Sequence, residues 1–291
     1  MELTAEDETH CEYVSSRGIL KSCDIHNPVP KSSDGFLDPA TYGNIPAGST
    51  VYVCTEAIPN FLKNFLPSAK GPVVVVSGDS DLSFPSDTTF LEDPKILHWF
   101  AQNSTGNHAK LSSIPIGLDY HTVSQQDHHW SPKMTPKQQE SQIKAFTAIE
   151  PKYSRRDHRA YGNFLLNISR GNRRKAYEQI PKDLMIYETG FVVRGITWWK
   201  QASAAFTVSP HGNGLDCHRT WETLVLGGIP VVESSWLDCL YEGLPVLIVN
   251  SWTEISRESL ETTIQAFEQR TFEVERLRLS YWISKIKGKT K

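Results

Sequence analysis

The pattern of apolar and polar residues divides the first part of the chain into short buried strands. Continuous apolar runs of four to six residues are typical of strands that are covered on both faces of a parallel sheet. Such runs predict strands at Thr50 to Cys54, Pro72 to Val76, Ile96 to Ala101 and Ile114 to Gly117, and a short helix over Ile58 to Leu66. Residues before about Asp34 show little periodicity and predict an irregular arm that lies on this unit.

The second part of the chain alternates between apolar runs and amphipathic stretches. The runs predict strands at Tyr161 to Ile168, Leu184 to Tyr187, Ala204 to Val208 and Ile229 to Val232. Helical spacing predicts helices over Arg173 to Gln179, Ile196 to Ala204 and Cys217 to Leu226, and terminal helices between Glu254 and Ile286. Strands that alternate with helices indicate an α/β fold with parallel sheets.

Between His121 and Tyr153 the chain is polar and rich in Gln, Lys, Ser and Pro, which predicts a linker or mobile loop. With 291 residues, the chain lies near the size at which one core gives way to two. We therefore expect an α/β domain over 1–150 that ends in the polar linker at about 121–153. A second α/β domain is expected over 151–260, followed by C-terminal helices over 261–291.

The segment from Ser209 to Glu222 is the most informative one for function. It begins at the end of a predicted strand, and its Gly212-Asn213-Gly214 turn permits backbone angles that bring amide groups close to a ligand. Asp216 is a predicted N-cap, and the helix that follows presents unpaired N–H groups and a partial positive charge to a phosphate. Arg219 can bind phosphate oxygens with two nitrogens, and Glu222, three residues on, can accept hydrogen bonds from ribose.

We therefore predict a nucleotide-diphosphate site on the second domain. Ligands of such sheets bind at the carboxyl ends of the strands, so the loop after the first strand of this domain is included. The predicted donor-binding residues are Ser169, Arg170, Ser209, His211, Gly212, Asn213, Gly214, His218, Arg219 and Glu222. The structural alternative is an ordinary turn, in which Arg219 and Glu222 form a surface ion pair.

The same segment resembles the signature of the exostosin-like glycosyltransferases. The likeness continues through Ile229 to Ser235 and Leu240 to Val246, and a weaker likeness covers Lys95 to Tyr120, so about half of the chain takes part. This resemblance implies an inverting transfer from a nucleotide sugar. It also implies the GT-B arrangement, in which two Rossmann-like α/β domains face a central cleft and a C-terminal helix crosses back.

Within that family the short chain is most similar to the xylosyltransferases of large algal viruses. This likeness implies UDP-xylose as the donor and a hydroxyl of a glycan as the acceptor, for example on an N-glycan of a viral glycoprotein. We expect a cytoplasmic protein, in the host cytoplasm if it is viral, because residues Met1 to His10 are acidic and polar, unlike a signal peptide. In this it departs from the membrane-anchored Golgi exostosins of animals and plants.

The composition argues against several classes of binding partner. Thirty-three acidic against thirty basic side chains give a formal charge of -3, which provides no bulk attraction to nucleic acid. No apolar stretch approaches the length of a membrane span. The five cysteines are odd in number and lack a C-x-x-C spacing, so we expect reduced thiols and no structural zinc site.

Transfer of a sugar also needs a base that removes the proton of the attacking hydroxyl. Asp79-Ser80-Asp81 follows a predicted strand of the first domain, at the edge that would face the acceptor. We predict Asp79 as the base, with Asp81 as the alternative and Asp119 and His121 as further acceptor-side candidates. No metal cofactor is expected, because the glycine turn and Arg219 can receive the leaving diphosphate.

Two other functions stay open. Asp79 and Asp81 form a literal Asp-x-Asp, the motif with which metal-dependent GT-A glycosyltransferases hold a divalent cation, and a chelator would abolish that activity. The other is a noncatalytic module that binds a sugar nucleotide or a glycan without turnover. Of the neighbouring Trp198 and Trp199, we expect one in the core and one at the cleft or surface.

Overall fold

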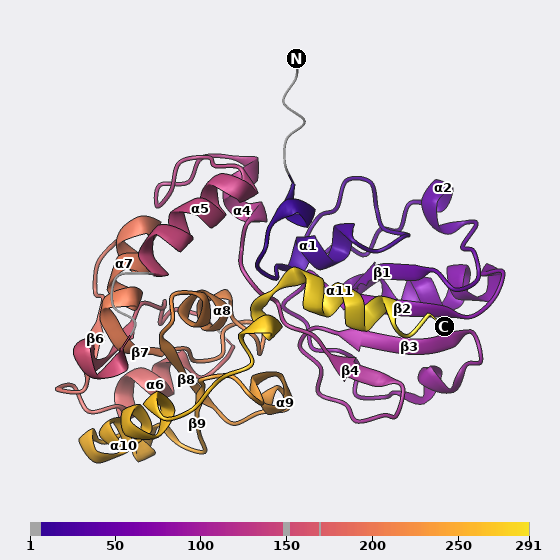
Figure 1. Ribbon diagram of the computed structural model, residues 1–291. Helices are drawn as coiled ribbons and strands as arrows, with labels where there is room; N and C mark the ends of the chain where they lie inside the picture. Colours follow the sequence, from indigo (N-terminus) through magenta and orange to yellow (C-terminus); the bar gives the residue numbers. More distant parts are fainter. Residues whose placement is uncertain (1–6, 148–151, 169, 291) are drawn as a thin grey trace.

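Two parallel sheets, each with helices around it, form two lobes (Figure 1). The computed structural model describes residues 7–147, 152–168 and 170–290. The first sheet has the strand order β1-β2-β3-β4, and the second has the order β6-β5-β7-β8-β9. The predicted α/β fold with two parallel sheets is therefore confirmed.

The first lobe is built on four strands, of which three lie where the apolar runs predict them. They are β1 (Thr50–Cys54), β2 (Val73–Gly78), β3 (Ile96–Ala101) and β4 (Leu111–Ser113). The connection from β1 to β2 is helical, as expected, and consists of η2 (Thr55–Ala57), α3 (Ile58–Asn60), η3 (Phe61–Phe65) and η4 (Leu66–Ser68). A short turn, η5 (Thr89–Glu92), precedes β3.

The strand predicted over Ile114 to Gly117 is wrong. β4 ends at Ser113, and the apolar residues after it form a buried loop that runs toward the second lobe. There the backbone of Gly117 pairs with Ser15, and a Cβ at position 117 would lie 2.2 Å from the carbonyl oxygen of Val14. This close packing explains why the run is apolar without being a strand.

The N-terminal arm is more ordered than its sequence indicates. It contains η1 (Glu8–His10) and α1 (Ser16–Lys21), and α2 (Pro39–Tyr42) follows it. Five of the six residues of α1 are buried, including the charged Arg17, so the expectation of an irregular arm is wrong for this segment. Burial against the rest of the fold, which local periodicity does not encode, stabilises this short helix.

The second lobe has the strand order of a doubly wound sheet. Its strands are β5 (Asp157–Gly162), β6 (Met185–Tyr187), β7 (Ala204–Val208), β8 (Ile229–Glu233) and β9 (Leu247–Val249). Numbered within the lobe, the order is 2-1-3-4-5, so the winding reverses between β5 and β7. Ligands of such sheets bind beyond the carboxyl ends of the two strands at this reversal.

Helices cover both faces of this sheet. They are α6 (Arg173–Gln179), α7 (Arg194–Ser203), α8 (His218–Val225), α9 (Asp238–Tyr241) and α10 (Arg257–Glu268), with the short turns η6 (Tyr153–Arg155) and η7 (Trp252–Glu254). The predicted helices agree with α6, α7 and α8 to within two residues. The predicted strand over Tyr161 to Ile168 is wrong in its bounds, because β5 begins earlier and ends at Gly162.

The polar segment after the first sheet contains two helices, separated by irregular chain over 126–135. They are α4 (His121–Gln125) and α5 (Pro136–Thr147), and α5 packs against α7 and α8 of the second lobe. The expectation of a loop is therefore wrong for 121–125 and 136–147. The predicted domain boundary between 150 and 151 lies outside the described residues.

The polar character of α5 is misleading because two of its buried residues bind backbone groups. The Gln139 side chain donates to the carbonyl oxygens of Tyr120 and Met134. Glu140 accepts from the backbone N–H groups of Glu12 and Tyr13. Polar side chains satisfied in this way can be buried at little cost.

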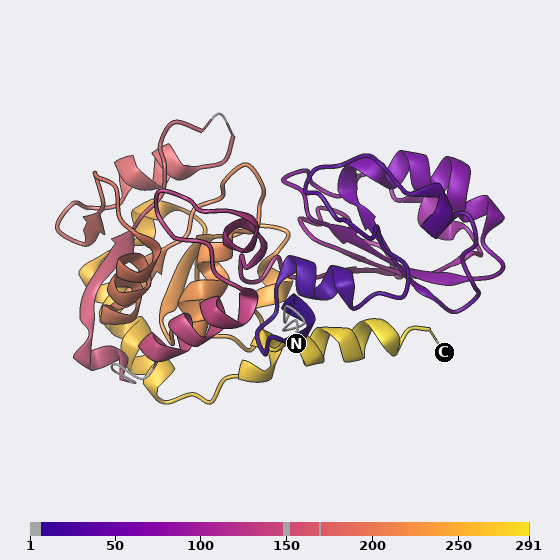
Figure 2. The ribbon, with the colours of Figure 1, turned by 90° about the horizontal axis from the view of Figure 1, so that it is seen from above.

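The C-terminal segment connects the two lobes. Leu260 and Ile264 of α10 pack in the core of the second lobe, and the chain then runs through η8 (Val274–Leu277) to α11 (Leu279–Lys287). Figure 2 shows α11 beside α1, along the first lobe. Trp282 and Ile286 belong to a core cluster that draws residues from both lobes.

All five cysteines, which lie within the described ranges, are free thiols, as the sequence predicts. Trp198 is 2% exposed and Trp199 is 47% exposed, so the expectation of one core and one surface tryptophan is confirmed. Among the described residues, no helix combines the length and the apolarity that crossing a membrane requires.

The buried His98 of β3 makes the stability of the fold depend on pH. Burial, together with the nearby charge of Lys289, lowers the pKa of His98 to about 4. The unfolded chain, with an ordinary histidine pKa of about 6.5, therefore takes up the proton first as the pH falls. This contribution to stability is present above pH ~6.5 and is lost between pH ~6.5 and about 4, at a rate of at most ~1.4 kcal/mol per pH unit.

We predict that urea unfolding at pH 7 and pH 5 shows a smaller loss of stability in His98→Gln than in the wild type. The exposed His129 provides the control, since His129→Gln should lose as much stability as the wild type. An equal loss in all three proteins would contradict this account.

Candidate functional site

A cavity of about 400 Å³ lies at the reversal point of the second sheet and opens toward the first lobe. We call it the switch-point cavity. Its wall comes from the loops after β5 and β7 and from α7 and α8. The first lobe adds Asp81 from the loop after β2, and Ile116 and Asp119 from the chain that follows β4. A ligand bound here would contact both lobes.

The glycine turn forms one wall of the switch-point cavity. A Cβ at Gly212 would lie 2.7 Å from Arg173 Nη2, and one at Gly214 would lie 3.0 Å from Asn103 Nδ2. The turn therefore packs closely against side chains of both lobes, and a larger residue would displace them. Among the described residues, the side chain of Cys217, the N-cap of α8, makes no capping hydrogen bond, and Thr220 N–H bonds to the Cys217 carbonyl oxygen. The helix start thus leaves the backbone N–H groups of His218 and Arg219 for a ligand.

Two half-buried guanidinium groups, each with a buried nitrogen, meet beside this turn. Arg219 donates from Nε to the carbonyl oxygen of Asn163 at 3.1 Å, but its Nη1 has no hydrogen-bond partner among the described residues. Arg173 Nε is likewise buried and has no partner in the part of the chain that the structure describes. Burial, reinforced by the charge of Arg173, lowers the pKa of Arg219. Two close cations with unused donors form a site that an anion would complete.

Further unpaired polar atoms lie on the α7 side of the cavity. Gln201 is fully buried, and within the described ranges neither its amide nitrogen nor its amide oxygen has a partner. The same holds for Trp198 Nε1 among these residues. Glu222 lies 3.4 Å from Arg194 Nη2, which leaves acceptor capacity on its carboxylate. This wall offers both donors and acceptors to a polar ligand.

The structure brings together part of the predicted donor site. The residues that line the switch-point cavity are Gly212, Asn213, Gly214, His218, Arg219 and Glu222. Ser209 and His211 do not line it: the Ser209 hydroxyl bonds to Thr220, and the ring of His211 bonds to the carbonyl oxygen of Leu215. Arg170 is exposed and lies outside the cavity wall, and Ser169 lies outside the described residues.

The predicted donor-binding set lacks several residues of the cavity wall, in particular Asn163, Arg173 and Gln201. Gly171, with a positive φ of 84°, turns the chain so that Arg173 rather than Arg170 faces the cavity. A signal for Arg173 was its place at a predicted helix start after the first strand. The sequence does not indicate a functional role for Gln201, since an isolated glutamine is common in a helix.

Asp216 joins the glycine turn to the first lobe and is not the N-cap that the sequence predicts. Its carboxylate accepts from the backbone N–H of Ile116 at 2.8 Å, from Cys217 N–H at 2.9 Å and from Trp221 Nε1 at 2.9 Å. Its own N–H donates to Asn103 Oδ1 at 2.8 Å. Burial raises the pKa of Asp216, and the hydrogen bonds oppose this shift. Asp216 therefore fixes the turn relative to both lobes.

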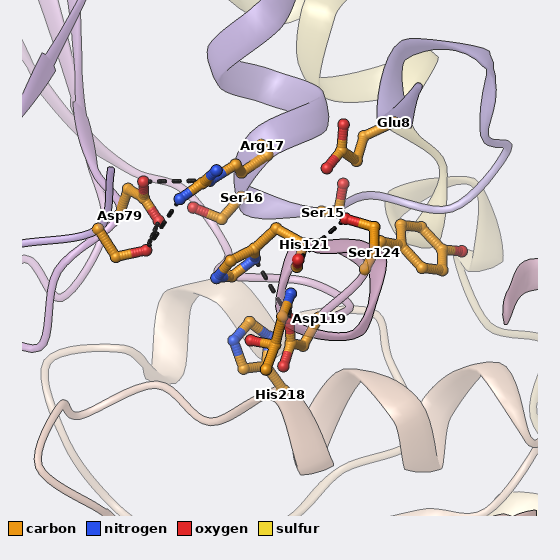
Figure 3. A network of polar contacts seen from close by, with 12 residues as sticks. Glu8, Ser15, Ser16, Arg17, Asp79, Asp119, His121, Ser124 and His218 are labelled. Atoms are coloured by element: carbon orange, nitrogen blue, oxygen red, sulfur yellow. Dashed lines mark hydrogen bonds and ion pairs between the residues drawn. The ribbon is translucent and has the colours of Figure 1, made fainter. Parts of the chain in front are cut away.

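The first lobe places carboxylates at the other side of the cleft. Asp79 follows β2 with a positive φ of 53°, and its side chain is 3% exposed. One of its oxygens lies 3.3 Å from Arg17 Nε (Figure 3). The other oxygen accepts from the Ser32 hydroxyl at 2.8 Å. Asp81 is exposed and lines both the switch-point cavity and a second cavity of about 160 Å³.

This second cavity, which we call the Asp79 cavity, is lined by Asp79, Asp81, His121 and His218 together with serines of the N-terminal arm. His121 Nδ1 lies 3.2 Å from Asp119 Oδ1 (Figure 3). His218 Nδ1 donates to the carbonyl oxygen of Gly117 at 2.7 Å. The predicted acceptor-side residues thus gather next to the switch-point cavity.

Ionisation of the Asp119–His121 pair follows from its surroundings. Burial lowers the pKa of His121, and the charge of Asp119 opposes this shift. Burial would raise the pKa of Asp119, but the charges of His218, His121 and Arg194 outweigh it and hold that pKa below its usual range. At pH 7 Asp119 is therefore an anion beside a neutral imidazole.

Among the described residues, no group of three or more His, Cys, Asp or Glu side chains is arranged to hold a metal ion. Arg17 and Ser32 already contact the two oxygens of Asp79, which reduces its capacity as a ligand. No protein-family model matches this chain, and no significantly similar curated protein is found. The function must therefore be argued from the chemistry of the site.

We predict that Asp216→Ala destabilises the protein by about 3 kcal/mol, because three N–H donors, one of them on the buried Trp221, lose their acceptor. Asp183→Ala removes an exposed carboxylate with a single surface ion pair and should change stability by less than about 0.5 kcal/mol. Urea unfolding monitored by tryptophan fluorescence measures both. If Asp216→Ala were as mild as the control, Asp216 would not be the link between the lobes.

Proposed function

We propose that this protein is an inverting glycosyltransferase, which transfers a sugar from a nucleoside diphosphate sugar to a hydroxyl group of an acceptor. One observation carries the proposal. At the reversal point of a doubly wound sheet, two guanidinium groups keep buried nitrogens without a partner in the described part of the chain. A diphosphate supplies the negative charge and the acceptor oxygens that Arg173 and Arg219 lack.

The diphosphate would lie against the glycine turn and the first turn of α8. Backbone N–H groups at a helix start bind phosphate oxygens, and the helix dipole adds favourable charge. Both effects grow when the sugar leaves, since the diphosphate then gains negative charge. Stabilisation that increases in the transition state is what accelerates a reaction.

The α7 side of the cavity suits the nucleoside. The Gln201 amide offers one donor and one acceptor side by side, which complements the imide edge of uracil. Glu222 can accept hydrogen bonds from ribose hydroxyls, as its place on the helix face predicts. These features support a uridine diphosphate sugar as the donor.

The acceptor hydroxyl would enter from the Asp79 cavity, which adjoins the switch-point cavity through Asp81, Ile116 and His218. Its oxygen attacks the anomeric carbon on the face opposite the diphosphate. The bond from that carbon to the diphosphate breaks, and its electron pair leaves with the nucleotide. The hydroxyl proton passes to the carboxylate of Asp79, and the anomeric configuration inverts.

The resemblance to exostosin-like glycosyltransferases supports the same function. In that arrangement, GT-B, two α/β domains face a cleft and a terminal helix crosses back. Here, two lobes border the switch-point cavity and α11 returns to the first lobe. We take UDP-xylose as the first donor to test and a glycan hydroxyl as the acceptor, both from this resemblance.

We predict that Arg173→Met and Arg219→Met each weaken UDP binding about tenfold or more, because each removes a charge-assisted hydrogen bond to the diphosphate. Affinity for uridine, which lacks phosphates, should stay within about twofold. Arg174→Met is the matched control: Arg174 adjoins Arg173, but it is exposed, lies 3.9 Å from Glu178 and does not line the cavity. Isothermal titration calorimetry measures the affinities.

UDP affinities that the Arg173 and Arg219 variants leave unchanged would contradict the proposed site. Turnover is measured separately, as UDP release from a panel of UDP sugars with glycan acceptors, with and without chelator. The proposal expects a transferred sugar of inverted configuration and no effect of the chelator. Activity lost to the chelator and restored by Mn²⁺ would support the metal-dependent alternative, and binding without any product would support a noncatalytic module.

A further inference from the structure

The segment before the first sheet carries side chains to the carboxylate of Asp79. Arg17 lies on α1, and Ser32 lies in the loop between α1 and α2. Both are separated from Asp79 by more than forty residues, and nothing in the local sequence indicates the contact. Figure 3 shows the Arg17 side chain extending from α1 to the Asp79 carboxylate.

Arg17, Ser32 and Asp79 contact one another. Arg17 is 6% exposed, and its Nε lies 3.3 Å from Asp79 Oδ2. Its Nη2 donates to the Ser32 hydroxyl at 3.2 Å, and that hydroxyl donates to Asp79 Oδ1 at 2.8 Å. The guanidinium supplies the opposite charge that a buried carboxylate requires, and Ser32 fixes the direction of the carboxylate plane.

The ion pair leaves part of Asp79 unused. Although Arg17 Nε and Asp79 Oδ2 are close, neither atom has a hydrogen-bond partner among the residues that the structure describes. Asp79 Oδ2 is thus a buried acceptor without a donor, in a side chain that lines the Asp79 cavity. A hydroxyl group placed in that cavity would supply the missing hydrogen bond.

Hydrogen bonds also fix the backbone of Asp79. Its φ of 53° lies in the left-handed region, which costs a residue other than glycine about 1–3 kcal/mol. The Asp79 N–H donates to Gln102 Oε1 at 2.9 Å, and Gln102 Nε2 donates in turn to the Ser16 hydroxyl and to the carbonyl oxygen of Pro115. Strain that is retained by such a network is common at reacting groups.

We propose that Arg17 and Ser32 are positioning residues that hold the Asp79 carboxylate as an oriented anion toward the acceptor hydroxyl. This inference rests on the proposed function, since it assigns Asp79 the proton of that hydroxyl. The N-terminal arm is then part of the reacting site. Arg17 touches Asp79 and not the donor cavity, so its loss affects the transfer step and not nucleotide binding.

The test compares Arg17→Met and Arg17→Lys with the wild type in steady-state transfer assays. Arg17→Met should lower kcat about tenfold to a hundredfold, in the range expected for a misplaced reacting group, and should leave the KM for the donor within about twofold. Arg17→Lys keeps the charge and should recover part of kcat. Ser32→Ala removes a single hydroxyl, so it is the variant least disturbing to folding, and it should lower kcat about threefold or more at unchanged donor KM.

Lys21→Met is the matched control. Lys21 lies on the same helix and also forms an ion pair, with Glu8 at 2.5 Å, but it does not line the Asp79 cavity. This variant should keep the wild-type kcat. A similar fall in kcat for Lys21→Met and Arg17→Met would indicate damage to α1 as a whole and would overturn the inference.

A double-mutant cycle separates positioning from a merely structural role. If Arg17 acts through Asp79, Arg17→Met should change the residual rate of Asp79→Asn by less than about twofold. Equal factors in both backgrounds would overturn the inference, as would unchanged kcat in both Arg17→Met and Ser32→Ala. Failure of the proposed function would look different, because the wild type itself would then release no UDP from any donor.

Discussion

The distribution of buried charge across the cleft is the constraint on which the rest of the site depends. Arg173 and Arg219 bring two cations together at the reversal point of the second sheet, and each keeps a buried nitrogen without a partner among the described residues. A buried donor of a charged group that lacks an acceptor costs free energy, which a fold tolerates where a ligand supplies the acceptor. On the facing lobe the buried charge of Asp79 is already compensated by Arg17. The second lobe thus offers Arg173 and Arg219 to an anion, and the first lobe presents the Asp79 carboxylate as an acceptor for a proton.

The two sides are coupled through the glycine turn. Asp216 and Asn103 bond the turn to the loop that leaves the first sheet, and His218 reaches the carbonyl oxygen of Gly117. The segment that would hold a diphosphate is therefore attached directly to the lobe that carries Asp79. This attachment fixes the distance between the cationic and the acidic walls, as a transfer between two bound substrates requires. α11, which packs beside α1 on the first lobe, gives a second connection between the lobes.

The sequence predicts those parts of the fold that depend on local pattern. Valine-rich β2 and the apolar β7 are covered on both faces, so their positions follow from the apolar runs. β4 is misplaced because this half-buried edge strand is polar, whereas the apolar Ile114 beside it packs in a loop. α5 is missed because Gln139 and Glu140 are buried through bonds to backbone groups, a tertiary effect that no periodicity records.

The residues of the candidate site likewise fall into those that local sequence predicts and those that depend on tertiary packing. Gly212, Gly214 and Arg219 are found from the sequence because a turn and a helix start place them a few residues apart. Arg17, Ser32 and Gln201 are not, because they reach the site only through the packing of α1 and α7.

A crystal structure of the protein with a UDP sugar, grown in the presence of a chelator, would test the central claim most directly. The account predicts the diphosphate between the glycine turn and the side chains of Arg173 and Arg219, with hydrogen bonds to Arg173 Nε and Arg219 Nη1. A nucleotide bound away from these two arginines, or one that binds only when a metal ion joins it to Asp79 and Asp81, would contradict it.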